Sequence, residues 1–278
     1  MAIFALLIAV ATITVSTFAW YIYNTSAHTT KVRMAAGSSV SLEISNKYDG
    51  EYSSTTVFDD KFVGKLSPVS TDRILDSSEK ETFQKVKEFV EGTPDKAPLL
   101  AKFFKPAEAA DYYKTSLYVR SRGSNCDLYL SDIGFEDADK NKPISTATRI
   151  GLVIRKPGKN KAVDEQYIFS INPKGSNPAA EYNTFNGSEG SVLSYSKTDG
   201  TTVKFDPLTS ENFAEYDSKT GIVTVTKQSQ ALCELKGDDD PVQIDIYVWL
   251  EGCDKDCTLS LMGATLKNIS LSFAGYMK

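Results

Sequence analysis

Two hydrophobic patterns divide the chain. Residues 1–23 are almost entirely apolar, and no Asp, Glu, Lys or Arg occurs before Lys31. From about residue 39, apolar and polar residues instead alternate in short runs separated by Gly, Pro, Asn and Asp. A long unbroken apolar run is typical of a helix buried on all sides, whereas alternation at period two is typical of half-buried strands. The pattern predicts a hydrophobic N-terminal helix followed by a β-rich body.

The apolar run predicts a helix over residues 1–27, followed by a polar neck over residues 28–38. At 1.5 Å per residue, about 23 residues span roughly 35 Å, enough to cross a hydrocarbon core of about 30 Å. Such a helix must lie in a membrane or pack against copies of itself. Its candidate assembly residues are Ile3, Phe4, Leu6, Leu7, Ile8, Val10, Ile13, Val15, Phe18 and Trp20. A cleaved signal peptide is a rival interpretation, but it needs a basic stretch before a shorter apolar core.

The body, residues 39–278, is predicted to be a β-sandwich of one or two lobes. The segments predicted as strands are 39–44, 116–120, 127–130, 149–155, 167–171, 202–205, 222–226, 242–250 and 265–273. Trp249, in the second-last of these, is predicted to anchor the core. The polar stretch 174–196 is predicted to be a surface excursion or the seam between two lobes. The fold class is therefore mainly β, with a long N-terminal helix.

One further helix is predicted, inserted between strands at the surface. Phe83, Val86, Phe89 and Val90 follow one another at i, i+3, i+6 and i+7, which places them on one helical face. Residues 78–81 (SEKE) are a typical helix start, and Gly92 is a typical stop. The Phe and Val stripe predicts packing against the sandwich.

Composition excludes several classes of function. The net charge of −5 leaves no basic footprint for nucleic acid. The single histidine, His28, lies just after the apolar run, so nucleophilic catalysis that depends on histidine is excluded in the body. No glycine-rich phosphate loop occurs. The chain is predicted to be neither an enzyme nor a cofactor-binding protein.

Four cysteines, Cys126, Cys233, Cys253 and Cys257, are candidates for disulfides if the body lies outside the cell. Cys253 and Cys257 bracket a turn-like tripeptide, which favours a bridge between them and leaves Cys126 for Cys233. Four cysteines allow three pairings, so the sequence does not fix the connectivity. A thiolate metal site is the rival interpretation, and the CxxxC spacing without a second pair is weak support for it.

Two further kinds of surface site have weak support in the sequence. Asn24, Asn186 and Asn268 each begin an Asn-x-Ser/Thr sequon, and each is a candidate glycosylation site. The acidic loops at Asp137–Asn141 and Asp238–Asp240 resemble calcium loops only in part, because Lys142 occupies the required glycine position in the first. Both loops are predicted to be solvated turns, and no metal site is expected.

An apolar N-terminal helix joined to a β-rich head resembles the type IV pilins and related filament subunits. In that family a peptidase removes a short basic leader, and the helix moves from the membrane into the filament core. Bacterial members usually have a glutamate at the fifth mature position, where this chain has Ala5, whereas archaeal members often lack it. The resemblance implies a structural subunit of an extracellular, cell-surface filament with an adhesion or surface-fibre role. Its partners would be copies of itself, the membrane before assembly and a secretion or assembly machinery.

A second resemblance overlaps the first. Residues 16–20 (STFAW), followed by a polar neck and the strand predicted over 39–44, resemble secreted biofilm fibre proteins of the camelysin and TasA type. In those proteins the apolar segment is cleaved, and a β-sandwich polymerises by lending a strand to its neighbour. Both resemblances imply a surface fibre subunit, but they disagree on whether the apolar segment is retained. A monomeric, membrane-anchored binding module remains the alternative.

Overall fold

The structure, a computed structural model, describes residues 31–36, 41–57, 66–86, 104–171, 194–196, 202–204, 207–252, 254, 256–257, 259–261 and 263–277. The strands are β1 (Lys31–Ala36), β2 (Ser41–Ser45), β3 (Thr55–Val57), β4 (Pro68–Val69), β5 (Gln84–Val86), β6 (Phe104–Pro106), β7 (Tyr113–Arg122), β8 (Cys126–Asp137), β9 (Thr148–Arg155), β10 (Val163–Ser170), β11 (Ser194–Ser196), β12 (Thr202–Lys204), β13 (Glu215–Asp217), β14 (Ile222–Thr224), β15 (Ala231–Leu235), β16 (Val242–Glu251) and β17 (Leu266–Tyr276). Within these residues, 3-10 helices lie at Ile144–Ala147, Ser210–Asn212 and Leu259–Leu261.

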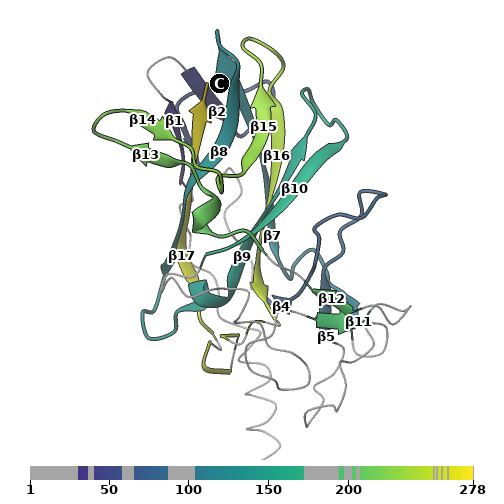
Figure 1. The fold of residues 1–278 in the computed structure, drawn as a ribbon. Coiled ribbons are helices and arrows are strands. Elements are labelled where there is room, and N and C mark those ends of the chain that lie inside the picture. The colour runs from purple at the N-terminus through teal and green to yellow at the C-terminus, as the bar shows by residue number, and fades with distance from the viewer. Residues whose placement is uncertain are drawn as a thin grey trace, which may run out of the picture.

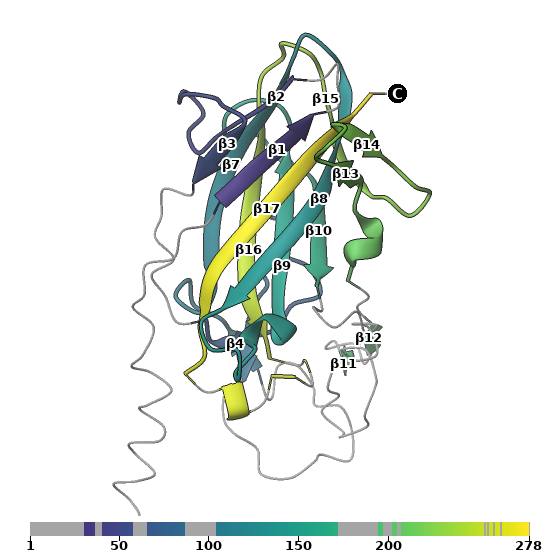
Figure 2. The same cartoon turned by 90° about the vertical axis from the view of Figure 1, so that its left-hand side faces the viewer.

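Two sheets pack face to face as a sandwich (Figures 1 and 2). Sheet A has the strand order β15-β8-β17-β1-β3, and sheet B has the order β10-β9-β16-β7-β2, with β4 added beside β16. The pairs β5–β6, β11–β12 and β13–β14 form separate two-stranded ribbons. The long strands β7, β8, β9, β16 and β17 hold most of the buried residues.

The main core lies between the two sheets, and strand alternation explains how it is filled. On β16 the alternate residues Ile244, Ile246 and Val248 belong to this core, together with Leu271 and Phe273 of β17. Every residue of β16 is buried, although the strand still alternates. The residues between the core positions must therefore be covered on the other face of sheet B.

A cover over the outer face of sheet B explains this second burial. Residues 66–86 cross that face, and Ile74 and Phe83 pack there against Tyr247 and Trp249 of β16. Gly151 on β9 allows the close approach, because a Cβ there would lie 2.5 Å from Cδ1 of Ile74. We call residues 66–86 the cover segment.

The first described strand, β1, lies inside sheet A. It pairs in parallel with β17, and the register sets Val32 beside Leu271 and Met34 beside Phe273. On its other side it pairs antiparallel with β3. These residues lie in the predicted neck, 28–38, and the structure makes them a strand inside sheet A (Figure 2).

Most predicted strands are confirmed within the described residues. The segments 116–120 and 127–130 lie in β7 and β8, and 149–155 and 242–250 coincide closely with β9 and β16. The segments 39–44, 167–171, 202–205, 222–226 and 265–273 correspond to β2, β10, β12, β14 and β17, with shifted ends. Within 174–196, the structure describes only β11. Trp249 is fully buried, as predicted for a core anchor.

The predicted fold class is wrong in its helices. The described part of the chain is mainly β, and its helical segments are 3-10 helices of three or four residues. A long N-terminal helix is not among these elements, and the residues predicted to form it, 1–27, lie outside the described residues. Among the described residues, no helix has the length and apolar character needed to cross a bilayer.

The inserted surface helix is also wrong, because its first half is a turn followed by β5. Asp76 Oδ1 accepts hydrogen bonds from the backbone N–H groups of Ser78 and Lys80 and so fixes the turn. Glu79 has a φ of 58°, which an α-helix does not allow. Phe83 then packs against Tyr247 and Trp249 of β16. Local capping and tertiary burial therefore override a weak helical periodicity.

Candidate functional site

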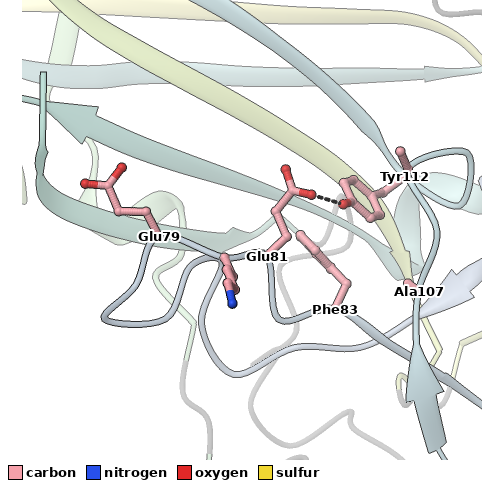
Figure 3. Close-up of a pocket in the computed structure, with 7 residues that line it drawn as sticks. Glu79, Glu81, Phe83, Ala107 and Tyr112 are labelled. Carbon is pink, nitrogen blue, oxygen red and sulfur yellow. Dashed lines mark hydrogen bonds between the residues drawn. The ribbon is translucent and has the colours of Figure 1, made fainter. Parts of the chain in front are cut away.

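The cover segment and the turn before β7 enclose a cleft of about 330 Å³ (Figure 3). We call it the carboxylate cleft. Its lining residues are Glu79, Lys80, Glu81, Phe83, Ala107, Ala109 and Tyr112. Glu79 and Glu81 come from the same turn, and the Tyr112 hydroxyl points at the Glu81 carboxylate (Figure 3).

Glu81 is the most highly coordinated group of the cleft. Its carboxylate accepts hydrogen bonds from Tyr112 Oη at 2.5 Å and Tyr247 Oη at 3.2 Å, and forms an ion pair with Lys114 Nζ at 2.8 Å. Burial alone raises the pKa of Glu81, but hydrogen bonds from Lys114 and Tyr112 outweigh it, so the pKa lies below 4.5. Glu81 therefore stays ionised at neutral pH and ties the cover segment to β7 and β16.

Glu79 is held by a second ion-pair chain. Arg155 donates from Nη1 to Glu79 Oε2 at 2.9 Å and from Nε to Asp245 Oδ2 at 2.7 Å. Asp245 is 2% exposed and also accepts a hydrogen bond from Ser116 Oγ. The hydrogen bond from Arg155 lowers the pKa of Glu79. Both glutamates of the cleft thus already form ion pairs with Lys or Arg side chains of the same chain.

Aromatic side chains form the floor under these carboxylates. Phe83 stacks on Tyr112 with ring centroids 4.3 Å apart and meets Trp249 edge to face at 5.2 Å. Tyr112 and Phe83 are both less than 10% exposed, so the rings face one another more than they face the cleft. The arrangement suits attachment of the cover segment better than stacking of a ligand.

The interactions of Glu81 predict that the cover segment is held less tightly at acidic pH. Because the folded pKa of Glu81 is lowered, its stabilising effect is present above about pH 4.5 and is lost as the pH falls through the folded pKa. We expect Glu81→Gln to reduce the free energy of unfolding by about 1 kcal/mol at pH 7, and by less at pH 3.5. Chemical denaturation at both pH values measures this difference. Glu108→Gln, at a 73% exposed side chain, is the matched control, and an equal loss in both variants would contradict the role of Glu81.

The acidic loops considered from the sequence serve as turns. Asp137 accepts hydrogen bonds from the backbone N–H and hydroxyl of Ser145, and Asp139 accepts one from the N–H of Asn141. Asp240 accepts a hydrogen bond from the Tyr48 hydroxyl. Among the described residues, no group of three or more His, Cys, Asp or Glu is placed to hold a metal ion.

The predicted modification sites are only partly described. Asn24 and Asn186 lie outside the described residues, whereas Asn268 lies in β17, opposite Glu136 of β8. Its side-chain oxygen is buried and has no hydrogen-bond partner. Asn268 is therefore a poor acceptor for a bulky glycan, although its modification stays a prediction.

The cysteines are also only partly described. Cys126, Cys233 and Cys257 are free thiols in this structure, and Cys253 is outside the described residues. The structure brings Cys126 and Cys233 onto neighbouring strands, β8 and β15. The two predicted bridges stay predictions.

The edges of the sandwich form a second candidate site, because unpaired strand edges can pair with a strand of another chain. On one side Tyr167 Oη of β10 donates to the carbonyl oxygens of Ala231 and Leu232 on β15, at 3.2 and 3.4 Å. On the other side Asn46 Nδ2 donates to the carbonyl of Val57 on β3, at 3.3 Å. Side chains thus cover part of both edges of sheet A.

Sequence reasoning missed the partners of Glu81, the cover segment and the place of β1. The only sequence signal for β1 was the alternation of Val32 and Met34 with polar or small residues, and the adjoining apolar run masked it. The predicted assembly residues, Ile3 to Trp20, lie outside the described residues. Comparison of the chain with models of protein families, with curated proteins and with solved structures finds no match.

Proposed function

We propose that the chain is a structural subunit of an extracellular surface fibre, joined to its neighbours through its N-terminal region. Two features support the proposal. The first thirty residues carry no Asp, Glu, Lys or Arg, and they run directly into β1, a strand of the sandwich. The partners are further copies of the chain, a membrane before assembly and a secretion machinery. Neither a nucleic acid nor a cofactor is involved.

The position of β1 is the observation that carries the proposal. It is the first described strand, and it pairs with β17 on one side and β3 on the other. Residues 37–40, with the sequence GSSV, connect it to β2 in the other sheet. A strand that is linked to the next strand, in the other sheet, through one short connection is suited to exchange between identical subunits.

The covered edges favour exchange over simple edge-to-edge addition. The side chains of Tyr167 and Asn46 donate hydrogen bonds to backbone carbonyl oxygens on the two edge strands of sheet A. In sheet B, the backbone of Leu208 bonds to Ile168 and Ser170 at the end of edge strand β10. A neighbour that adds to these edges must first displace these contacts, whereas an exchanged β1 remakes the hydrogen bonds that it leaves.

The apolar N-terminal segment supplies the free energy that favours the fibre. Exchange of β1 replaces contacts within a chain by identical contacts between chains, so it contributes little by itself. Burial of the uncharged segment between subunits contributes about 25 cal/mol per Å² of apolar surface, and lost translational and rotational entropy opposes it. Removal of residues 1–30 should therefore weaken assembly and leave the sandwich folded.

A cysteine pair across β1 and β17 tests the proposal. Arg33 and Ser272 are register partners, so Arg33→Cys combined with Ser272→Cys allows a cross-link. After assembly and mild oxidation, we expect the cross-linked peptides to come from two different chains, as shown by mixing isotope-labelled and unlabelled subunits. The single variant Arg33→Cys is the control. Cross-links only within chains would contradict exchange, and single particles without fibres in electron micrographs of the full chain would contradict the fibre itself.

A further inference from the structure

Two of the free thiols lie on one face of neighbouring strands. In the β15–β8 pair, Cys233 is opposite Leu128 and Leu235 is opposite Cys126, so the two cysteines are diagonal neighbours. Cys126, Leu128 and Leu235 belong to the core between the sheets, and Cys233 packs against it. Directly paired residues share a face, so both thiols face the same core.

The β15–β8 ladder is irregular next to Cys233, and a bond between the two cysteines would need a shift of β15. Diagonal residues on an antiparallel pair are farther apart than the Cβ separation of about 3.5–4.5 Å that a disulfide requires. The ladder is irregular between Ala231 and Cys233, where β15 carries an extra residue. Because β15 has only β8 as a ladder neighbour, a small shift of β15 disturbs no second ladder.

We propose that Cys126 and Cys233 form a redox-dependent disulfide that fixes the edge strand β15 to β8. The structure describes the reduced form, with both thiols free. The inference rests on the proposed function, since an extracellular subunit meets an oxidising environment. The bond keeps β15 paired with β8 and leaves exchange to β1, beyond β17 on the other side of β8.

The bond forms by thiol–disulfide exchange with an external disulfide oxidant. One cysteine thiolate attacks a sulfur of the oxidant and releases the first oxidant thiolate. The second cysteine thiolate then attacks the mixed disulfide and releases the other. The chain loses two thiol protons and two electrons, and the oxidant becomes two thiols.

Both thiols are poorly reactive while β15 is paired with β8. Burial, and then the neighbouring Cys126, raises the pKa of Cys233 to about 12, and burial also raises the pKa of Cys126. The attacking thiolate is therefore scarce in the closed state. Oxidation requires β15 to open from β8, and it should proceed before the sandwich closes or during local opening of this edge.

The test treats the full chain with oxidised glutathione, alkylates the remaining thiols under denaturing conditions and maps linked peptides by mass spectrometry. We expect a peptide pair linking Cys126 and Cys233, and a Tm about 5–10 °C higher without reductant than with it. Cys126→Ser and Cys233→Ser should each remove the link and the effect of reductant on Tm. Cys257→Ser, the matched control, should retain both.

A second variant keeps the inference falsifiable. Cys126→Ser combined with Leu128→Cys places a thiol directly opposite Cys233, in the favourable register. If this variant links and the wild-type chain does not, the diagonal separation prevents the bond and the inference fails. It also fails if Cys126 or Cys233 links to Cys253 or Cys257 instead. Fibres from a chain whose Cys126 and Cys233 stay reduced would overturn the disulfide alone, and linked chains that never form fibres would overturn the proposed function alone.

Discussion

We expect Arg149→Met to lower the free energy of unfolding by about 3–5 kcal/mol at pH 7. The Arg149 side chain is 1% exposed and pairs with the Asp254 carboxylate, which is 0% exposed. Its guanidinium also donates to the carbonyl oxygen of Thr148 at 3.0 Å. Methionine fills much of the volume but leaves a buried carboxylate without its cation. Urea denaturation of wild type and variant measures the loss.

The pH dependence of this loss identifies its cause. Burial raises the pKa of Asp254, and Arg149 acts in the opposite direction. Without Arg149 the folded-state pKa of Asp254 rises further. Asp254 in the variant therefore takes up its proton at a higher pH than in wild type, and the variant gains stability relative to wild type as the pH falls. The difference between Arg149→Met and wild type should therefore be smaller at pH 5 than at pH 7. A difference independent of pH would contradict an uncompensated charge on Asp254.

Two controls separate the charge from the packing. Arg149→Met combined with Asp254→Leu removes both charges, and it should recover most of the lost stability. Arg122→Met removes an ion pair with Glu43 at a 52% exposed side chain, and should cost less than about 1 kcal/mol. Equal losses for Arg122→Met and Arg149→Met would show that burial does not determine the effect.

We expect Phe83→Ala to detach the cover segment from sheet B and to cost up to about 3–5 kcal/mol. Phe83 is 2% exposed and contacts the rings of Tyr112, Tyr247 and Trp249. Alanine removes the ring that all three share and leaves a cavity beside β16. The loss in free energy of unfolding stays below this range if the cover segment opens before the sandwich unfolds, because Phe83 is then already detached when the sandwich unfolds.

Amide hydrogen exchange distinguishes local opening from global unfolding. The N–H groups of Ile74 and Leu75 both donate to Gln166 Oε1 at 3.0 Å, so they report on attachment of the cover segment to β10. In Phe83→Ala these two amides should exchange much faster, while amides in the middle of β16 change less. Tyr216→Ala, at a 39% exposed ring, is the control and should leave both unchanged. Uniform acceleration along the chain would contradict a separable cover.

The accuracy of the sequence predictions follows the range of the interactions involved. Strand periodicity located β9 and β16 closely, because aliphatic residues recur at every second position in the middle of each. Helical periodicity failed over residues 78–86, the described part of the predicted helix, which form a turn followed by β5. Phe83 serves a contact with Trp249, far away in the sequence, and local periodicity does not contain that information.

The candidate sites were less predictable than the strands. The sequence singled out the acidic loops, where Asp137 and Asp139 accept hydrogen bonds from nearby backbone N–H groups. It did not single out Glu81, whose partners Lys114 and Tyr247 come from two other strands. Nor did it show that Arg149 pairs with Asp254 inside the protein. Such pairs depend on which strands become neighbours, and many strand orders are compatible with one pattern of alternation.

By itself, the sequence determined the mainly β character of the body, the buried role of Trp249 and the contrast between an uncharged start and a charged remainder. These properties depend on residue type and local spacing. Only the tertiary structure decided that β1 lies beside β17, that Glu81 of the cover segment meets Lys114 and Tyr247, and that Cys126 and Cys233 share one face. The physical reason is that backbone hydrogen bonds between strands are chemically alike, so their partners are chosen by packing of the whole chain.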